Sequence, residues 1–241
     1  MTEAPHIVRS YDEELGRLDT LVARMGGLAE AQLECAVRAL ARRDSDLAGR
    51  VVANDSRIDS LDREMHATAV RLLALRQPAG VDLRTVVSCL TLSGDLERMG
   101  DYAANIGKRV LALNQVDQVA TAHSVPRMGT LVQELVHEVV EAFLSRDAAR
   151  ARAVWRRDTA VDDVYASFFR EAVTYMMEDP HNITACTHLM FIAKNVERIG
   201  DHCTNIAERV HFLVAGEVMP VRHRVDQETP EGGRDGHGND G

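Results

Sequence analysis

The sequence is poor in the residues that build sheets, interrupt helices or cross membranes. Aromatic side chains make up only 4% of its 241 residues, and there are six prolines. A shortage of aromatic residues and proline favours helices over strands. No stretch reaches the roughly 18 consecutive apolar residues of a membrane-spanning helix. The first residues carry early acids and no apolar segment typical of a secretory signal, so we expect no export.

Cysteine and net positive charge are scarce as well. The four cysteines are far apart, form no CxxC pair and lie inside apolar helical patterns, which is typical of packed, reduced thiols. The formal net charge of -9 argues against broad electrostatic binding to nucleic acid or to an anionic membrane surface, and it leaves room for a local basic patch. We therefore expect a cytoplasmic protein that binds no nucleic acid and contacts a membrane only through its partners.

Helical periodicity fills most of the chain, with apolar residues at spacings of three and four. Asp44 is a plausible N-cap for the second helix, and Pro78 ends that helix. Residues 114 to 126 show no clear period and predict a connection between two halves. The predicted helices span residues 11–43, 44–77, 82–113, 128–144, 147–177 and 182–215.

An internal repeat is the most informative feature of the sequence. The segment LERMGDYAANIGKRV, residues 96–110, recurs as VERIGDHCTNIAERV, residues 196–210, with eight of fifteen positions identical. Upstream, the offset becomes 103, where Arg43-Asp44 and two further aspartates match Arg146-Asp147 and their own two aspartates. Each half therefore has the order long helix, Asp-capped helix and helix with the repeated motif.

The repeat predicts an all-α fold of two tandem, pseudo-symmetric three-helix bundles, each with its own core. We place the first bundle at residues 1–116 and the second at residues 117–216. Residues 217–241 are rich in glycine and charge and poor in apolar side chains, so we predict a disordered C-terminal tail.

Pairs of acids recur in register in both halves. Residues four apart lie on one face of a helix, so each pair brings two like charges together beside an apolar seam. Arg98 and Arg109 project toward the opposite face of their helix and are not obvious counter-ions for these acids. A bound hard cation is the simpler compensation. The candidate metal ligands are Asp55, Asp59, Glu97 and Asp101 in the first half and Asp158, Asp162, Glu197 and Asp201 in the second.

Two other interpretations of the acids remain open. The acids could cap or cross-link helices through arginines, or be solvated on a metal-free helical scaffold. In the second half Asp162 is followed by Asp163, so either acid could face inward. Glu134 and His137 have the ExxH spacing of di-iron bundles, but that site needs a second ExxH and two more inward Glu residues from other helices, and His137 has no counterpart in the first half.

The two motifs LERMGDYAANI and VERIGDHCTNI, each preceded by a helix with DxxxD, resemble the signature of the PhoU family. The resemblance covers residues 7 to 216. It implies two three-helix bundles and metal binding by the eight acids named above, with iron, zinc, manganese or magnesium as candidate ions. It also implies a homodimer.

The same resemblance implies a function that composition and spacing cannot reveal. Members of the family restrain the phosphate-specific ABC transporter and relay its state to a phosphate-sensing histidine kinase. The expected function is negative regulation of phosphate uptake and of phosphate-starvation signalling, with the transporter ATPase subunit and the kinase as partners. The protein would then be cytoplasmic and reach the inner membrane through these partners, without a reaction of its own.

Two further functions compete with this one. A metal-dependent oxidase or phosphatase built on the acids would need an open coordination position and a general acid or base nearby. No His or Lys recurs beside the acid pairs in both halves to serve that role. The other alternative is the metal-free scaffold, which metal analysis would separate from both.

Overall fold

The computed structural model describes residues 4–117, 119 and 123–219, with side chains from residue 11 onward. Every regular element in these ranges is helical, as the all-α prediction requires. Within them, no helix is both long enough and apolar enough to cross a membrane. Most of the predicted disordered tail, residues 220–241, lies outside the described residues.

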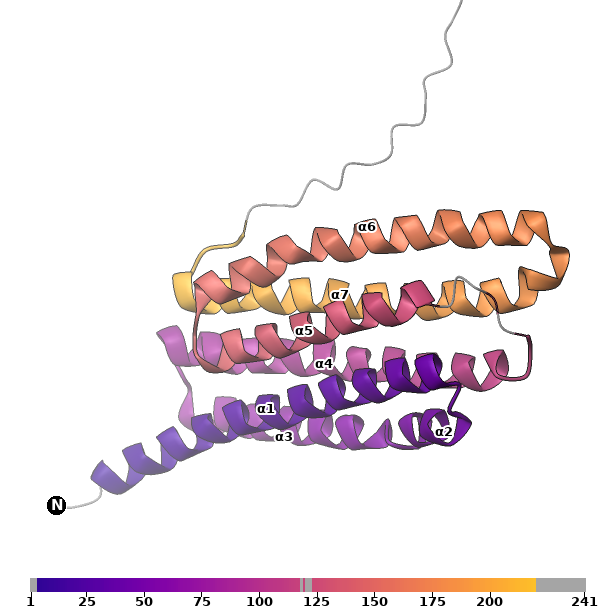
Figure 1. The fold of residues 1–241 in the computed structure, drawn as a ribbon. Coiled ribbons are helices and arrows are strands. Elements are labelled where there is room, and N and C mark those ends of the chain that lie inside the picture. Colours follow the sequence, from indigo (N-terminus) through magenta and orange to yellow (C-terminus); the bar gives the residue numbers. More distant parts are fainter. Residues whose placement is uncertain (1–3, 118, 120–122, 220–241) are drawn as a thin grey trace, which may run out of the picture.

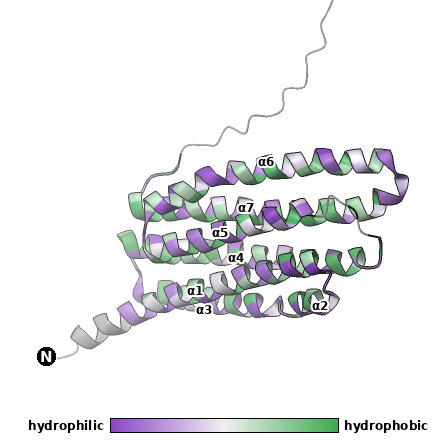
Figure 2. Cartoon of the chain, viewed as in Figure 1, coloured by the Kyte–Doolittle hydropathy of each residue, from purple (hydrophilic) through white to green (hydrophobic). Residues whose placement is uncertain are grey.

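The helices run side by side along one common direction, with the first half of the chain stacked against the second (Figure 1). Hydrophilic and hydrophobic residues alternate along each helix (Figure 2), as expected of amphipathic helices with one face toward a core. The first half contains α1 (Ala4–Arg42), α2 (Ser45–Ala53), α3 (Ser56–Arg76) and α4 (Gly80–Leu113). The second contains α5 (Ser124–Leu144), α6 (Ala148–Glu178), the short 3-10 helix η2 (Pro180–Asn182) and α7 (Ile183–Ala215).

The repeated Arg-Asp pair builds the same turn twice. Arg43 and Arg146 adopt positive φ angles of 52° and 55°, which end α1 and α5. The aspartate that follows each arginine then caps the next helix: Asp44 accepts a hydrogen bond from the Leu47 backbone N–H, and Asp147 accepts from two backbone N–H groups. The predicted Asp caps are confirmed in both halves.

The second predicted helix is not continuous. It is divided at Asn54 and Asp55 into α2 and α3, whereas its counterpart α6 is unbroken. The Asn54 N–H still bonds to the Arg50 carbonyl, but the next backbone bond runs from the Arg57 N–H to the Asn54 carbonyl, a tighter spacing of three residues. The break places Asp55, one of the predicted metal ligands, at a helix junction.

The expectation of a separate core in each half is wrong. The buried apolar residues described by the structure form one continuous cluster that includes members of every α-helix. The halves meet through α4 against α7 and through α1 against α5. Helices α4 and α7 each bury one face inside their own bundle and another face against each other. The apolar core therefore continues from one half of the chain into the other.

Two reciprocal glycine contacts join α1 to α5. Gly26 of α1 faces Val140 of α5, and a Cβ at Gly26 would lie 2.6 Å from a Val140 methyl carbon. Gly129 of α5 faces Val37 of α1 in the same way. Both pairs obey the repeat offset of 103, so the internal symmetry brings each glycine opposite the other half's valine. These contacts let the two helices approach closely.

The Gly26 contact generates a stability prediction. Gly26→Ala should lower the free energy of unfolding by about 1–3 kcal/mol, because the added methyl overlaps Val140 in a filled core. Gly27→Ala is the matched control: nothing lies within 4 Å of its Cβ position, so it should be neutral or stabilising by up to about 1 kcal/mol through helix propensity. Urea unfolding measures both variants, and equal effects would contradict the assigned packing.

Candidate carboxylate sites

The four predicted acids of the first half lie between α3 and α4. Asp55 sits at the junction of α2 and α3, and Asp59 lies in the first turn of α3. Glu97 and Asp101 lie one turn apart on α4. All four side chains are partly buried. The structure therefore places acids that are about 40 residues apart in sequence on two neighbouring helices.

The charges of these acids act on one another. Burial raises the pKa of Asp55 above its ordinary value, and the neighbouring charges of Asp101 and Asp59 raise it further. The pKa of Glu97 is also raised by burial first, and then by Asp101. Both shifts are those of carboxylates losing hydration beside like charges. This confirms the electrostatic conflict inferred from the sequence.

A buried glutamine that the sequence reading missed lies beside Asp55. Gln32 of α1 is only 6% exposed, and its Oε1 has no hydrogen-bond partner among the described residues. A Cβ on Gly100 would lie 3.3 Å from Gln32 Oε1 and 3.6 Å from Asp55 Oδ1, so the missing side chain of Gly100 leaves room for both oxygens. A buried amide oxygen without a donor is an additional candidate ligand for a hard cation.

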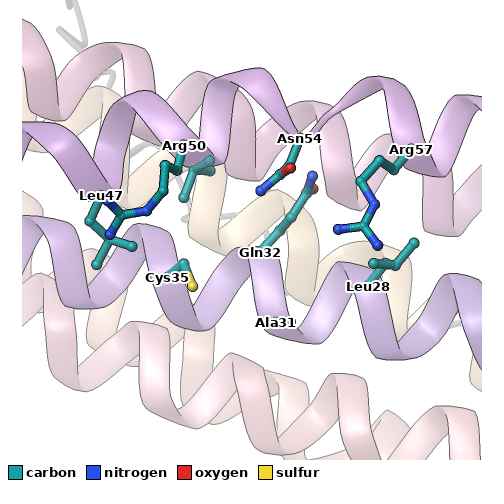
Figure 3. Close-up of a pocket in the computed structure, with 9 residues that line it drawn as sticks. Leu28, Ala31, Gln32, Cys35, Leu47, Arg50, Asn54 and Arg57 are labelled. Carbon is teal, nitrogen blue, oxygen red and sulfur yellow. The ribbon is translucent and has the colours of Figure 1, made fainter.

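A small pocket of about 140 Å³ opens at this junction, between α1 and the helices α2 and α3. In Figure 3, Gln32 reaches from α1 toward Asn54, with Arg50 and Arg57 on either side. Cys35 and apolar side chains of α1 form its floor. Gln32 therefore both lines this pocket and lies near the acids.

The role assigned to Arg98 requires a correction. Its Nη1 lies 3.3 Å from Asp101 Oδ2 and its Nε lies 3.8 Å from Glu97 Oε2, so it is a counter-ion for both acids. The flexible side chain bends back along the surface of its own helix, which an angular count from Cα positions does not capture. Because Arg98 is 61% exposed, solvent weakens this compensation.

Two acids of the second half, Asp158 and Glu197, are more buried than their counterparts in the first half, and Glu197 has a different cationic partner. Asp158 is 3% exposed and Glu197 is 6% exposed. Asp158 Oδ1 would lie 3.1 Å from a Cβ at Gly200, the counterpart of Gly100. Lys194, whose side chain is 43% exposed, donates from Nζ to Glu197 Oε1 at 2.7 Å, and the corresponding position in the first half is Gly94.

The choice between Asp162 and Asp163 is settled by burial. Asp162 is partly buried and Asp163 is exposed, so Asp162 is the acid turned toward the bundle, as its counterpart Asp59 is. Asp201 on α7 is partly buried, like its counterpart Asp101. The repeat therefore places the acids of both halves on corresponding helix faces.

The side chains as placed do not form a closed metal cage. Within the described ranges, no three His, Cys, Asp or Glu side chains converge closely enough to hold one ion. The chemistry of the donors still suits a hard cation, since the first site offers carboxylates with raised pKa values and the orphaned Gln32 oxygen. Metal binding therefore stays a prediction.

The ExxH pair is placed on the surface. Glu134 accepts a hydrogen bond of 2.6 Å from Arg157, and His137 Nδ1 lies 3.3 Å from Glu30 of α1. Both side chains are more than half exposed. These contacts connect α5 to α6 and to α1, and they give the pair a structural role.

The chain matches the PhoU domain model over residues 22–110 and again over residues 125–210. The phosphate-specific transport system accessory protein PhoU homolog of Caulobacter vibrioides is 54% identical over 220 residues, which cover 91% of this chain and 95% of that protein. The homolog of the same name from Zymomonas mobilis is 45% identical, over 92% of this chain and 94% of that protein.

Two crystal structures share the fold. PhoU from Pseudomonas aeruginosa superposes with a TM-score of 0.84 at 39% identity, covering 86% of this chain and all (100%) of that one. The phosphate transport system regulatory protein PhoU from Streptococcus pneumoniae superposes with a TM-score of 0.81 at 31% identity, covering 88% of this chain and 100% of that one.

The raised pKa values predict how stability depends on pH. Asp55 and Glu97 keep their protons to a higher pH in the folded protein than in the unfolded chain. The free energy of unfolding therefore falls as the pH rises from about 4, near the pKa of the unfolded carboxyl groups, through the raised pKa values of the folded protein. With a chelator present to remove metal ions, Glu97→Gln should have a higher urea midpoint of unfolding than the unmodified protein at about pH 7 and the same midpoint at about pH 3. Exposed Asp163→Asn is the control and should show no such pH difference. A Glu97→Gln variant that is less stable at neutral pH would contradict the shift.

Proposed function

The chain belongs to the PhoU family, and on that basis we propose that it is a negative regulator of phosphate uptake and phosphate-starvation signalling. It acts by binding the ATPase subunit of the phosphate ABC transporter, the phosphate-sensing histidine kinase, or both. Binding restrains the transporter and keeps the kinase from activating the starvation genes while phosphate is plentiful.

The observation that carries this proposal is the paired motif on α4 and α7. Each copy falls within one of the two matched PhoU segments. The relatives that match over nine-tenths of this chain are named accessory proteins of a phosphate-specific transport system. An accessory protein of a transporter acts through contacts, so we assign it no reaction of its own.

The location and assembly follow from the same proposal. A partner of a transporter ATPase and of a kinase works in the cytoplasm, at the inner face of the membrane that holds them. We place the protein there, with membrane contact only through its partners. We also propose that it works as a homodimer, as the family resemblance implies.

The carboxylate sites are proposed to bind metal, one site in each half. The residues that would hold an ion are Asp55, Asp59, Glu97 and Asp101, with Gln32 beside them, and Asp158, Asp162, Glu197 and Asp201. A cation supplies positive charge that offsets the repulsion of the acids. By joining α3 to α4 and α6 to α7, these residues would fix the surface offered to partners.

Metal content tests this part of the proposal. Replacing Glu97 and Asp101 by Ala should remove about half of the metal bound by protein reloaded with iron, zinc, manganese or magnesium, because each half carries its own ligands. Adding Glu197→Ala and Asp201→Ala should remove the rest. Elemental analysis of protein purified without a histidine tag gives the readout, with Asp163→Asn as a control of full content. A fourfold variant with unchanged metal would contradict the proposed ligands.

A deletion strain tests the regulatory function. A cell without this protein should express a phosphate-starvation reporter in abundant phosphate, because the signal from the transporter to the kinase is no longer restrained. The intact gene should restore silence. A version ending at Gly216 should do so as well, since Gly216 adopts φ of 74° and closes α7 with a hydrogen bond to the Phe212 carbonyl.

The controls for this strain separate regulation from metal binding. Metal-site variants that fold but fail to silence the reporter show that the carboxylates shape the partner surface, whereas full complementation shows that the metal is incidental. The regulatory assignment is wrong if the reporter stays silent in a deletion strain with no second copy of the gene.

A further inference from the structure

The antiparallel contact between α4 and α7 contains an internal carboxylate that is neutralised from the other half. Asp95 of α4 is only 7% exposed. Its Oδ1 lies 2.8 Å from His202 Nδ1, and its Oδ2 accepts a hydrogen bond of 2.9 Å from Arg209 Nε on α7. On one side of the pseudo-symmetric interface, therefore, the arginine of the repeated motif binds an anion that the chain itself supplies.

The other side of the interface lacks that anion. By the offset of 100, Arg109 corresponds to Arg209, and Asn195 corresponds to Asp95. An amide cannot supply the carboxylate, and Arg109 makes no ion pair with any residue that the structure describes. Its guanidinium instead lies 4.3 Å from the centre of the Phe191 ring. The side of the interface that holds Asn195 therefore keeps the cation of the pair and lacks its anion.

A pocket of about 440 Å³ lies at this position. It is lined by Asn105, Lys108, Arg109, Ala112, Phe191 and Asn195. Two of these six side chains are cations, two are amides, and none is an acid. In the corresponding pocket on the other side Arg209 is held by Asp95, and Glu208 stands where the first has Lys108.

The donors in this pocket are largely uncommitted. Lys108 Nζ donates to Asn105 Oδ1 over a long 3.3 Å, which leaves the Asn105 amide hydrogens available. Asn195 uses its amide nitrogen to bond to the Phe191 carbonyl at 2.7 Å. The charge of Lys108 offsets a small part of the rise in the pKa of Asp55, which burial, Asp101 and Asp59 cause. Lys108 is exposed and already lines the pocket.

We propose that the pocket between Arg109 of α4 and Asn195 of α7 binds a phosphoryl oxyanion, either inorganic phosphate or the phosphate group of a nucleotide. Arginine presents a planar fork of N–H donors that matches two oxygens of such a group, and lysine adds a point charge. The bound oxyanion takes the place that the Asp95 carboxylate takes in the other half. The inference rests on the α4–α7 contact and is independent of the proposed regulatory partners.

The test is a binding titration of the full-length protein by calorimetry, with inorganic phosphate and with ATP in separate arms at constant chloride ionic strength. Saturable binding of one ligand per chain is expected in at least one arm. Binding of phosphate identifies the free anion as sufficient, whereas binding of ATP alone identifies a nucleotide as the source of the phosphoryl group.

Three variants locate the site. Arg109→Gln should weaken binding at least about tenfold, because it removes the charged donor. Asn195→Asp should abolish binding, since it installs the carboxylate that fills the other half's site, and it should leave the fold stable by adding a partner for Arg109. Arg152→Gln is the matched control, because it makes the same charge change at an exposed position on α6. This variant should bind the ligand as the unmodified protein does.

Two results would overturn the proposal. The first is the absence of saturable binding of either ligand at concentrations up to about 10 mM, where even a weak site is filled. The second is binding that Asn195→Asp and Arg109→Gln leave unchanged, which would place the ligand elsewhere. Circular dichroism of each variant establishes that a loss of binding is not a loss of fold.

Discussion

The packing of one half of the chain against the other is the constraint on which the rest of this structure depends. Helices α4 and α7 each have to bury one face within their own bundle and a second face against each other. This requires small residues on the inner faces, and Gly100 and Gly200 occupy corresponding positions where the preceding helix comes close. The reciprocal contacts of Gly26 and Gly129 make a second joint between α1 and α5. The two halves are consequently repeats in sequence that share one hydrophobic core.

The same close packing accounts for the unusual electrostatics of the acids. At Gly100 the absent side chain lets Asp55 and Gln32 approach α4, and Glu97 lies one turn away on the same helix. Bringing carboxylates together in a partly buried space raises their pKa values and is unfavourable by itself. Arg98 offsets part of this in the first half, and Lys194 does so in the second. The acids of the two halves are thus compensated by different cations: Arg98 is exposed, whereas Lys194 pairs with a buried acid.

The two repeats differ at important positions where they meet. Asp95 neutralises Arg209 across the interface, but its counterpart Asn195 leaves Arg109 without an acid partner in the described part of the chain. Glu208 accepts a hydrogen bond from the Trp155 indole, whereas its counterpart Lys108 faces solvent. The two ends of the pseudo-symmetric interface therefore differ in charge: one end has a closed ion pair and the other has a cationic pocket.

The sequence alone determined the features that depend on neighbours along the chain. Helix type, the Asp44 and Asp147 caps and the shared faces of the acid pairs follow from short-range periodicity, and the repeat determined that these features occur twice. Only the tertiary structure decided the single core, the turn of Arg98 toward Asp101, the burial of Gln32 beside Asp55, and the unequal partners of Arg109 and Arg209. Each of these depends on where a side chain comes to rest or on a contact between helices distant in sequence, and a linear pattern records neither. The physical reason is that periodicity fixes which face of a helix is apolar, whereas packing decides which other helix covers that face.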